Sequence, residues 1–199
     1  MKANVGMEYP VAAPISAYTP YSGISYGTGF VVSQAREANL SYETEDGEFR
    51  GDNVTLDSAN GVIGYTLEFE NTGLSNTVRK NLLGEVKGSN DEYKITGASA
   101  PDVGFGYCAE MRDDSSGTST TKWEAWWFHK IKFSMPNENH KQKERNKEWR
   151  GTTISGKGAG VYLSANADHP DFVEHKEFSS LADAKSYLNT KAGISVVST

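Results

Sequence analysis

The chain has 199 residues, a formal net charge of −6 at pH 7 and a mean hydropathy of −0.58, values typical of a soluble globular protein with one sizeable core. The acidic balance argues against a nucleic-acid-binding protein, and no stretch has the ~20 apolar residues of a membrane span. The one cysteine, Cys108, excludes an internal disulfide and fits a reducing compartment, and no signal peptide is expected at the N-terminus.

Residues 1–23 contain three prolines, Pro10, Pro14 and Pro20, among small and aromatic residues. Proline removes a backbone donor and is incompatible with the interior of a helix or of a central strand. We therefore expect residues 1–23 to form an extended N-terminal arm, either flexible or bound to a partner. Residues 25–34 and 38–44 have the composition of strands, and the second of these leads into an acidic segment.

This acidic segment, residues 40–61, contains six acids and one base, Arg50. Asp46–Gly47 favours a two-residue hairpin turn, because such a turn needs positive φ. With that turn, Glu43, Glu45, Glu48 and Arg50 share one face of the hairpin. Like charges that oppose one another in a sheet are destabilising. The pattern therefore indicates a surface whose role is to be negative, although a solvated hairpin is the simpler interpretation.

The next two elements are distinguished by their apolar period. Alternation over residues 62–70 predicts a strand with one apolar face, made of Ile63, Tyr65, Leu67 and Phe69. A spacing of four then predicts a helix over residues 74–87 that packs on a sheet, with the apolar stripe Leu74, Val78, Leu82 and Val86. Thr72 or Ser75 is its expected N-cap, and Gly88 its expected end.

Strands are predicted again over residues 102–111 and 122–134, and the second of them is rich in aromatic residues. Alternation places Trp123 and Trp127 on one face, with Ala125, His129, Ile131 and Phe133. It places Trp126 and Phe128 on the other face, with Lys130 and Lys132. A strand that is apolar on both sides is typical of a core or a subunit interface. The alternative is an exposed aromatic platform that stacks on sugars.

The rest of the chain offers weak signals for chemistry. Residues 135–150 are a charged edge strand or a loop, and residues 148–155 and 160–165 are candidate closing strands. Gly151–Lys157 matches the phosphate-binding pattern G-x-x-x-x-G-K, but Gly158 replaces the hydroxyl residue, and a strand follows instead of a helix. The four histidines lack metal-ligand spacing, and neither a catalytic residue nor a cofactor is expected. Residues 166–199 are a C-terminal extension with a short helix, capped by Ser180.

Taken together, six segments resemble the major tail proteins of long, non-contractile-tailed bacteriophages and prophages, the subunits of the tail tube. The resemblance covers most of the chain and rests on the order of the segments: residues 9–20, 26–54, 56–74, 100–107, 122–134 and 148–162. It does not include residues 112–121 or 168–177.

The resemblance implies one mainly-β (α+β) domain over residues 1–199: two packed sheets, in a sandwich or barrel-like arrangement, flanked by one helix. It also implies hexameric rings that stack into a hollow tube through which DNA passes without specific binding. Tape-measure, tail-terminator and baseplate or initiator proteins are the implied partners, and the location is the virion, after assembly in the bacterial cytoplasm. No membrane is involved.

Stacked rings would explain the acidic hairpin in one of two ways. Glu43, Glu45, Glu48 and Asp52 either face the lumen and repel DNA, or bridge adjacent rings and meet basic residues such as Lys141, Lys143 or Arg145. The runner-up function is a β-sandwich carbohydrate-binding module that uses the aromatic residues Trp123, Trp126, Trp127 and Phe128. A third, the nucleotide-using enzyme, depends on the incomplete Gly151–Lys157 pattern.

Overall fold

The computed structural model describes residues 2–51, 54–113, 119–137 and 151–195, with the backbone alone for 2–4, 46–51, 54–60 and 113. The strands are β1 (Lys2–Thr19), β2 (Gly23–Tyr26), β3 (Phe30–Val31), β4 (Ala35–Gly51), β5 (Val54–Asn71), β6 (Val86–Lys87), β7 (Tyr93–Lys94), β8 (Val103–Asp113), β9 (Thr120–Phe133), β10 (Thr152–Gly158) and β11 (Val173–Phe178). The helices are α1 (Asn76–Leu83) and α2 (Leu181–Ala192).

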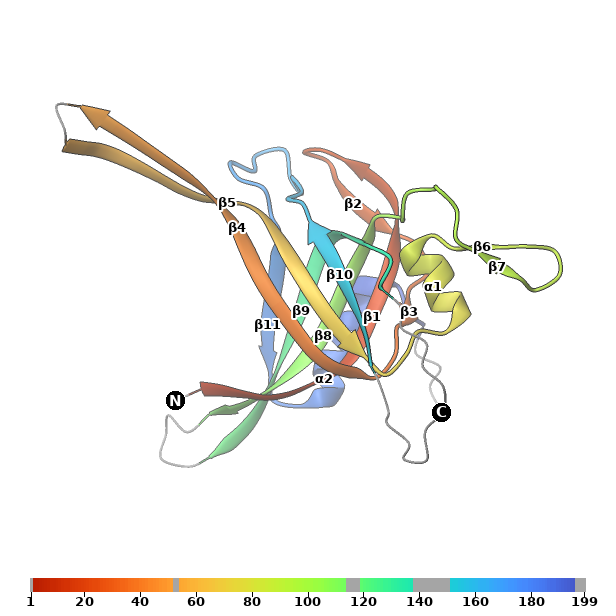
Figure 1. Cartoon of the computed structure of the whole chain (residues 1–199). Helices are drawn as coiled ribbons and strands as arrows, with labels where there is room; N and C mark the ends of the chain where they lie inside the picture. The colour runs from red at the N-terminus through yellow and green to blue at the C-terminus, as the bar shows by residue number, and fades with distance from the viewer. Residues whose placement is uncertain (1, 52–53, 114–118, 138–150, 196–199) are drawn as a thin grey trace.

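Nine of these strands form one antiparallel sheet, in the order β2-β1-β8-β9-β10-β5-β4, with β11 beside β9 and β3 beside β1 (Figure 1). The sheet coils until its two halves share one core: Phe105 of β8 and Phe128 of β9 pack in the same cluster as Leu67 and Phe69 of β5. A mainly-β fold is therefore confirmed, but the prediction of two packed sheets is wrong. The second sheet is the two-stranded ribbon β6–β7.

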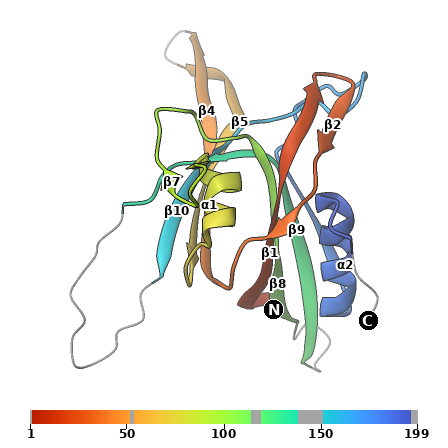
Figure 2. The ribbon, with the colours of Figure 1, turned by 90° about the vertical axis from the view of Figure 1, so that its right-hand side faces the viewer.

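Two helices lie on opposite sides of the strands β1, β8 and β9 (Figure 2). Helix α1 closes the main core with Val78, Leu82 and Leu83, and helix α2 covers a second apolar cluster around Trp127. Ser75 caps α1, but the helix ends at Gly84, whose φ of 78° is in the left-handed region, so it is shorter than predicted and Val86 belongs to β6.

The C-terminal helix agrees with its sequence signals. The Ser180 hydroxyl oxygen accepts a hydrogen bond from the backbone N–H of Asp183, as an N-cap should, and the apolar positions Ala184 and Leu188 are buried. The C-terminal segment also contributes β11, which pairs along β9 from Phe178 to Val173. The expected closing strand at residues 160–165 is reduced to a single bridge between Val161 and Asp171.

The prediction that residues 1–23 cannot be a central strand is wrong. Strand β1 pairs with β8 from Lys2 to Pro14, and its second half also pairs with β2 and β3. Pro10 lies where the β1–β8 register shifts, a site at which proline is tolerated. Pro14 accepts a hydrogen bond from Gly27 on the side away from β8, so its missing N–H does not interrupt the β8 ladder.

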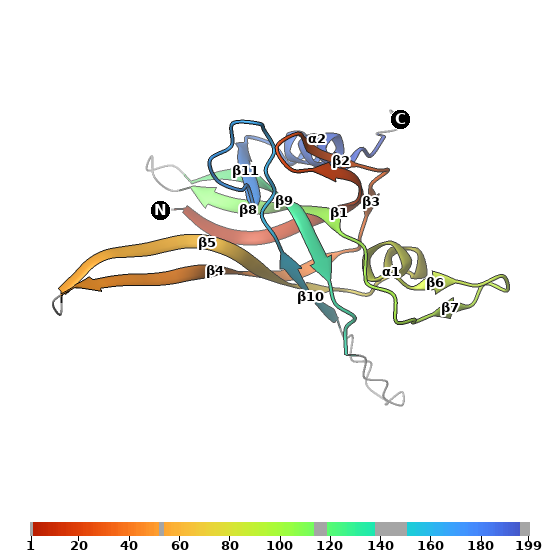
Figure 3. The ribbon, with the colours of Figure 1, turned by 90° about the horizontal axis from the view of Figure 1, so that it is seen from above.

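The acidic hairpin exists, but its turn is not at Asp46–Gly47. Strand β4 continues to Gly51 and pairs with β5 throughout, with Asp46 opposite Asn60, so the chain reverses between Gly51 and Val54. In this register Glu43 and Glu45 still alternate onto one face of β4, whereas Glu48, three residues beyond Glu45 on the same strand, belongs to the other face. The hairpin projects far from the body of the molecule, as Figure 3 shows from above.

Candidate assembly surface and polar network

The aromatic strand β9 runs through the interior of the protein. Trp127 and Phe128 are completely buried on opposite faces of the sheet, Trp127 against α2 and Phe128 in the main core. Trp123 and Trp126 are partly buried. Fully buried rings cannot stack on a sugar, so the four-residue platform required by a carbohydrate-binding module is not formed.

A bulge in β9 changes which residues share a face. Phe105 pairs with Phe128, whereas Val103, two residues earlier, pairs with Ile131, three residues later. The extra residue places Ile131 and Phe133 in the core cluster of Phe128. The expectation that they share the face of Trp127 is therefore wrong, because strict alternation does not hold across a bulge.

Trp126 belongs to a small cluster at the surface of β9 and β11. Its indole N–H donates to Glu124 Oε2 at 3.0 Å, and its ring stacks on His175 with centroids 4.8 Å apart. The Nδ1 atom of His175 lies 2.6 Å from Glu124 Oε1. These contacts hold Trp126 in one orientation, at the edge of a groove between β1 and β4.

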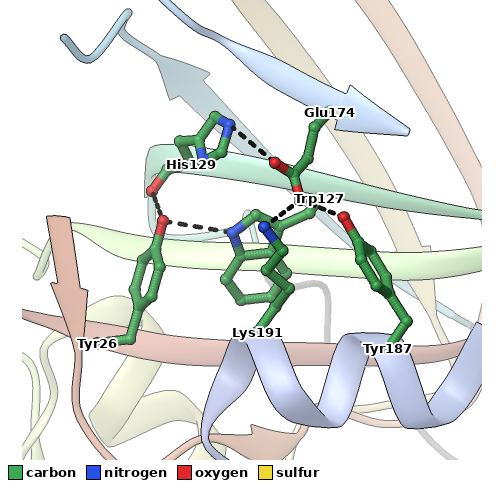
Figure 4. A network of polar contacts seen from close by, with 6 residues as sticks. All are labelled: Tyr26, Trp127, His129, Glu174, Tyr187 and Lys191. Atoms are coloured by element: carbon green, nitrogen blue, oxygen red, sulfur yellow. Dashed lines mark hydrogen bonds and ion pairs between the residues drawn. The ribbon is translucent and has the colours of Figure 1, made fainter. Parts of the chain in front are cut away.

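A larger network of polar side chains joins α2 to the sheet (Figure 4). Glu174 of β11 accepts hydrogen bonds from Tyr187 and Lys191 of α2, and its Oε2 lies 3.7 Å from His129 Nε2. The backbone of His129 belongs to the same network, because the hydroxyl of Tyr26 donates to its carbonyl oxygen at 2.9 Å. That hydroxyl also accepts a hydrogen bond from Trp127 Nε1 at 3.3 Å.

The electrostatics of this network indicate a structural role. Burial lowers the pKa of His129, so the ring is neutral near pH 7. Burial alone would raise the pKa of Glu174, but the hydrogen bonds and positive charge of Lys191 outweigh it and lower the pKa. Burial raises the pKa of Tyr26 to about 12, and its hydroxyl remains protonated. The network therefore holds a carboxylate between two donors and fastens α2 to β11.

An open groove lies where the coiled sheet fails to close. Its volume is about 370 Å³, and it separates the first half of β1 from β4. The lining residues are Val5, Gly6, Met7, Arg36, Glu37, Ala38, Leu40, Tyr107, Ala109 and Trp126. Arg36 pairs with Glu70 at 2.7 Å, and Glu37 accepts a hydrogen bond from Asn39, so the charges at the rim have partners and the floor is mainly apolar.

Of the four predicted acidic residues, the structure describes the side chains of Glu43 and Glu45. Glu43 and Glu45 are exposed on β4, and Glu43 lies 3.9 Å from Lys157, a weak contact between exposed groups. Glu48 lies on the hairpin where only the backbone is described, and Asp52 lies outside the described residues. The bases Lys141, Lys143 and Arg145 are also outside the described residues.

The phosphate-binding pattern of Gly151–Lys157 has a different use. Its last six residues, Thr152–Lys157, belong to β10, which pairs with β5 and β9, so no helix N-terminus faces an anion there. Within the described ranges, no group of three or more His, Cys, Asp or Glu side chains could hold a metal ion.

Cys108 is buried, and burial raises the pKa of its thiol to about 12, so the thiol is protonated near pH 7.

Sequence reasoning missed both the groove and the network around Glu174. The groove has no local signal, since β1 and β4 meet only after the sheet coils. A weak signal existed for the network: Tyr187 and Lys191 are four residues apart and lie on one side of a predicted helix.

Comparison with models of known protein families finds no match to this chain, and comparison with curated proteins finds none either. No helix in the part of the chain that the structure describes is long and apolar enough to cross a membrane.

Proposed function

We propose that the chain is a structural virion protein: a subunit that self-assembles into stacked hexameric rings and forms the tail tube of a long-tailed bacteriophage. The observation that carries this proposal is the β4–β5 hairpin, which leaves the body of the protein as an isolated two-stranded ribbon (Figure 3). An isolated ribbon of this kind is at best marginally stable in water. A neighbouring subunit that packs against it would remove this weakness.

Two further points support the same proposal. The resemblance to tail-tube subunits extends over most of the chain, and it includes both the hairpin and the aromatic strand β9. The mainly-β fold with a helix on the sheet is compatible with such a subunit. In this function the chain has no catalytic residue, DNA passes through the tube without specific binding, and the partners are other copies and the tape-measure, terminator and initiator proteins.

Negative-stain electron microscopy of the purified protein over a concentration series tests the proposal. Hollow tubes or rings with sixfold symmetry are the expected result. Because tail subunits can wait for an initiator, the series is repeated with preformed tube ends from a phage lysate as seeds. Particles that remain monomeric with and without seeds would contradict the proposed function.

A further inference from the structure

Helix α2 is held on the sheet by a small apolar contact. Its fully buried apolar side chains are Ala184, Leu188 and Ala192, and two of these three are alanine. An alanine methyl group removes little apolar surface from water. The apolar attachment therefore depends mainly on Leu188 and on the partly buried Leu181 and Tyr187. The rest of the attachment is polar.

Polar side chains fasten α2 to the strands at three points along the helix. Lys185 lies 3.5 Å from Glu8 of β1, and Asn189 accepts a hydrogen bond from the hydroxyl of Tyr9 at 2.9 Å. The third point is the carboxylate of Glu174 on β11 (Figure 4). The pair of Lys185 and Glu8 is partly exposed and contributes little. The contacts at Asn189 and Glu174 therefore decide whether α2 stays on the sheet.

The contact at Asn189 is made by a residue with a strained backbone. Tyr9 has a φ of 56°, in the left-handed region, and it lies where the β1–β8 register shifts between Glu8 and Val11. A non-glycine residue keeps such a conformation only where the surrounding contacts hold it. The side chain of Tyr9 packs on the cluster below α2 and bonds to Asn189. The docked helix therefore helps to hold this strain, and the strain favours release of the helix.

The contact at Glu174 encloses a titratable ring. His129 is 4% exposed, and its Nε2 lies 3.7 Å from Glu174 Oε2. Charged and titratable groups surround the His129 site from three elements: Glu174 on β11 with Asp171 shortly before it, Tyr187 and Lys191 on α2, and Tyr26 on β2. Burial is the main influence on the ring and lowers its pKa, so the closed structure keeps His129 neutral.

A proton on His129 is accommodated better when α2 is away from the sheet. In the closed structure the negative charge of Glu174 is already matched by Lys191, and an imidazolium would be a second cation in an enclosed site. Departure of α2 removes Lys191 and Tyr187 and admits water to the ring. The open state therefore binds the proton more tightly, and acid shifts the equilibrium towards it.

We propose that α2 is a lid that opens in mild acid: protonation of His129 loosens the Glu174 contact, and α2 turns away from the sheet about residues 179–180. Strand β11 stays in place, because it pairs with β9 from Val173 to Phe178. The open lid uncovers the apolar face below it, with Cys108 and Trp127. This inference concerns the single subunit and goes beyond the proposed assembly.

The one cysteine of the chain reports the opening. Cys108 is completely buried in the cluster below α2, so a thiol reagent reaches it when the lid opens. Labelling uses dipyridyl disulfide, which reacts in mild acid, on the unassembled wild-type subunit. The labelling rate, relative to that of protein unfolded in urea at the same pH, should rise about fivefold to tenfold between about pH 7.5 and about pH 5.5. This range follows from a histidine that titrates near pH 6.5 in the open state and stays neutral in the closed one.

Hydrogen exchange followed by mass spectrometry locates the opening. After correction for the intrinsic exchange rate at each pH, the backbone amides of α2 should lose protection in acid, while those of β8 and β9 keep it. Loss of protection in β8 and β9 to the same degree as in α2 would show global unfolding and refute the lid.

Three variants test the residues of the mechanism. His129→Gln should remove the acid response of the labelling rate. Tyr187→Phe keeps the ring but loses the hydrogen bond to Glu174, so labelling near pH 7.5 should become about fivefold faster or more. Ser186→Ala changes an exposed position of α2 and is the matched control, with an unchanged rate. Far-UV circular dichroism confirms that each variant folds.

Each result decides one part of the inference. A wild-type labelling rate that changes less than about twofold over this pH range would refute the lid. An acid response that persists in His129→Gln would exclude His129 as the trigger. If His129→Gln does not fold, Tyr187→Phe decides, since unchanged labelling of that variant would refute the Glu174 contact as the fastening. All of these measurements are made on the unassembled subunit, so their failure leaves the proposed tube function standing.

Discussion

Gly158 lies where an aromatic ring occupies the space of a side chain. A Cβ atom added to Gly158 would stand 1.8 Å from Cζ of Tyr65, the residue opposite it in the β10–β5 ladder. Tyr65 is 1% exposed, and its hydroxyl donates to the carbonyl oxygen of Lys130 at 3.0 Å. The ring therefore cannot move without losing core contacts and this hydrogen bond.

We predict that Gly158→Ala lowers the free energy of unfolding by about 2–4 kcal/mol. Overpacking of a core costs about 1–3 kcal/mol, and loss of the Tyr65 hydrogen bond adds about 1 kcal/mol. Urea unfolding followed by tryptophan fluorescence measures the change, at protein concentrations below those at which the subunits assemble. The chain contains four tryptophans as reporters, and Trp127 is fully buried.

Gly61→Ala is the matched control, since no atom lies within 4 Å of the added Cβ and Gly61 is exposed on β5, the strand that Gly158 faces. Its free energy of unfolding should change by less than about 0.5 kcal/mol, or rise slightly because alanine restricts the unfolded chain. Equal unfolding midpoints for Gly158→Ala and Gly61→Ala would refute the packing argument for Gly158.

Three other predictions concern charge, the helix cap and titration. The double substitution Glu43→Lys and Glu45→Lys should raise the protein concentration needed for assembly, and adding Lys141→Glu and Lys143→Glu to the same chain should lower it again. Normal assembly of the first variant would contradict a contact between the acidic hairpin and the basic residues of an adjacent ring. Ser180→Ala should lower the free energy of unfolding by about 1 kcal/mol, measured by urea titration, because α2 loses its cap. The pKa of His129 is lowered in the folded protein, so the unfolded state binds more protons and stability should fall as the pH drops below about 6.5. His129→Gln should flatten this part of the pH profile, and an unchanged profile would exclude His129 as its source.

The elements that agreed with the sequence are those whose signal is local. Alternation over residues 62–70 predicted a strand, and Tyr65, Leu67 and Phe69 are buried as expected. Ser180 sits three residues before Asp183, and this spacing alone specifies the capping contact. Composition and alternation also predicted strands at β8 and β9, because their apolar residues recur with the period of a pleated sheet.

The features that disagreed were decided by contacts between distant segments. Asp46–Gly47 is a good turn sequence, yet the register set by Leu40 opposite Leu67 carries both strands past it. Proline is unfavourable in a strand in general, but a register shift at Pro10 and the outward direction of Pro14 make β1 compatible with both.

Length, charge pattern and period determined that this chain is a mainly-β protein with an acidic hairpin and a capped C-terminal helix. The tertiary structure alone decided that the sheet coils into one core, leaves a groove between β1 and β4, and exposes Tyr42 and Ile63 at the hairpin base. The physical reason is that strand order and coiling depend on which apolar faces can be buried together. This balance is summed over the whole chain and is not encoded in any one segment.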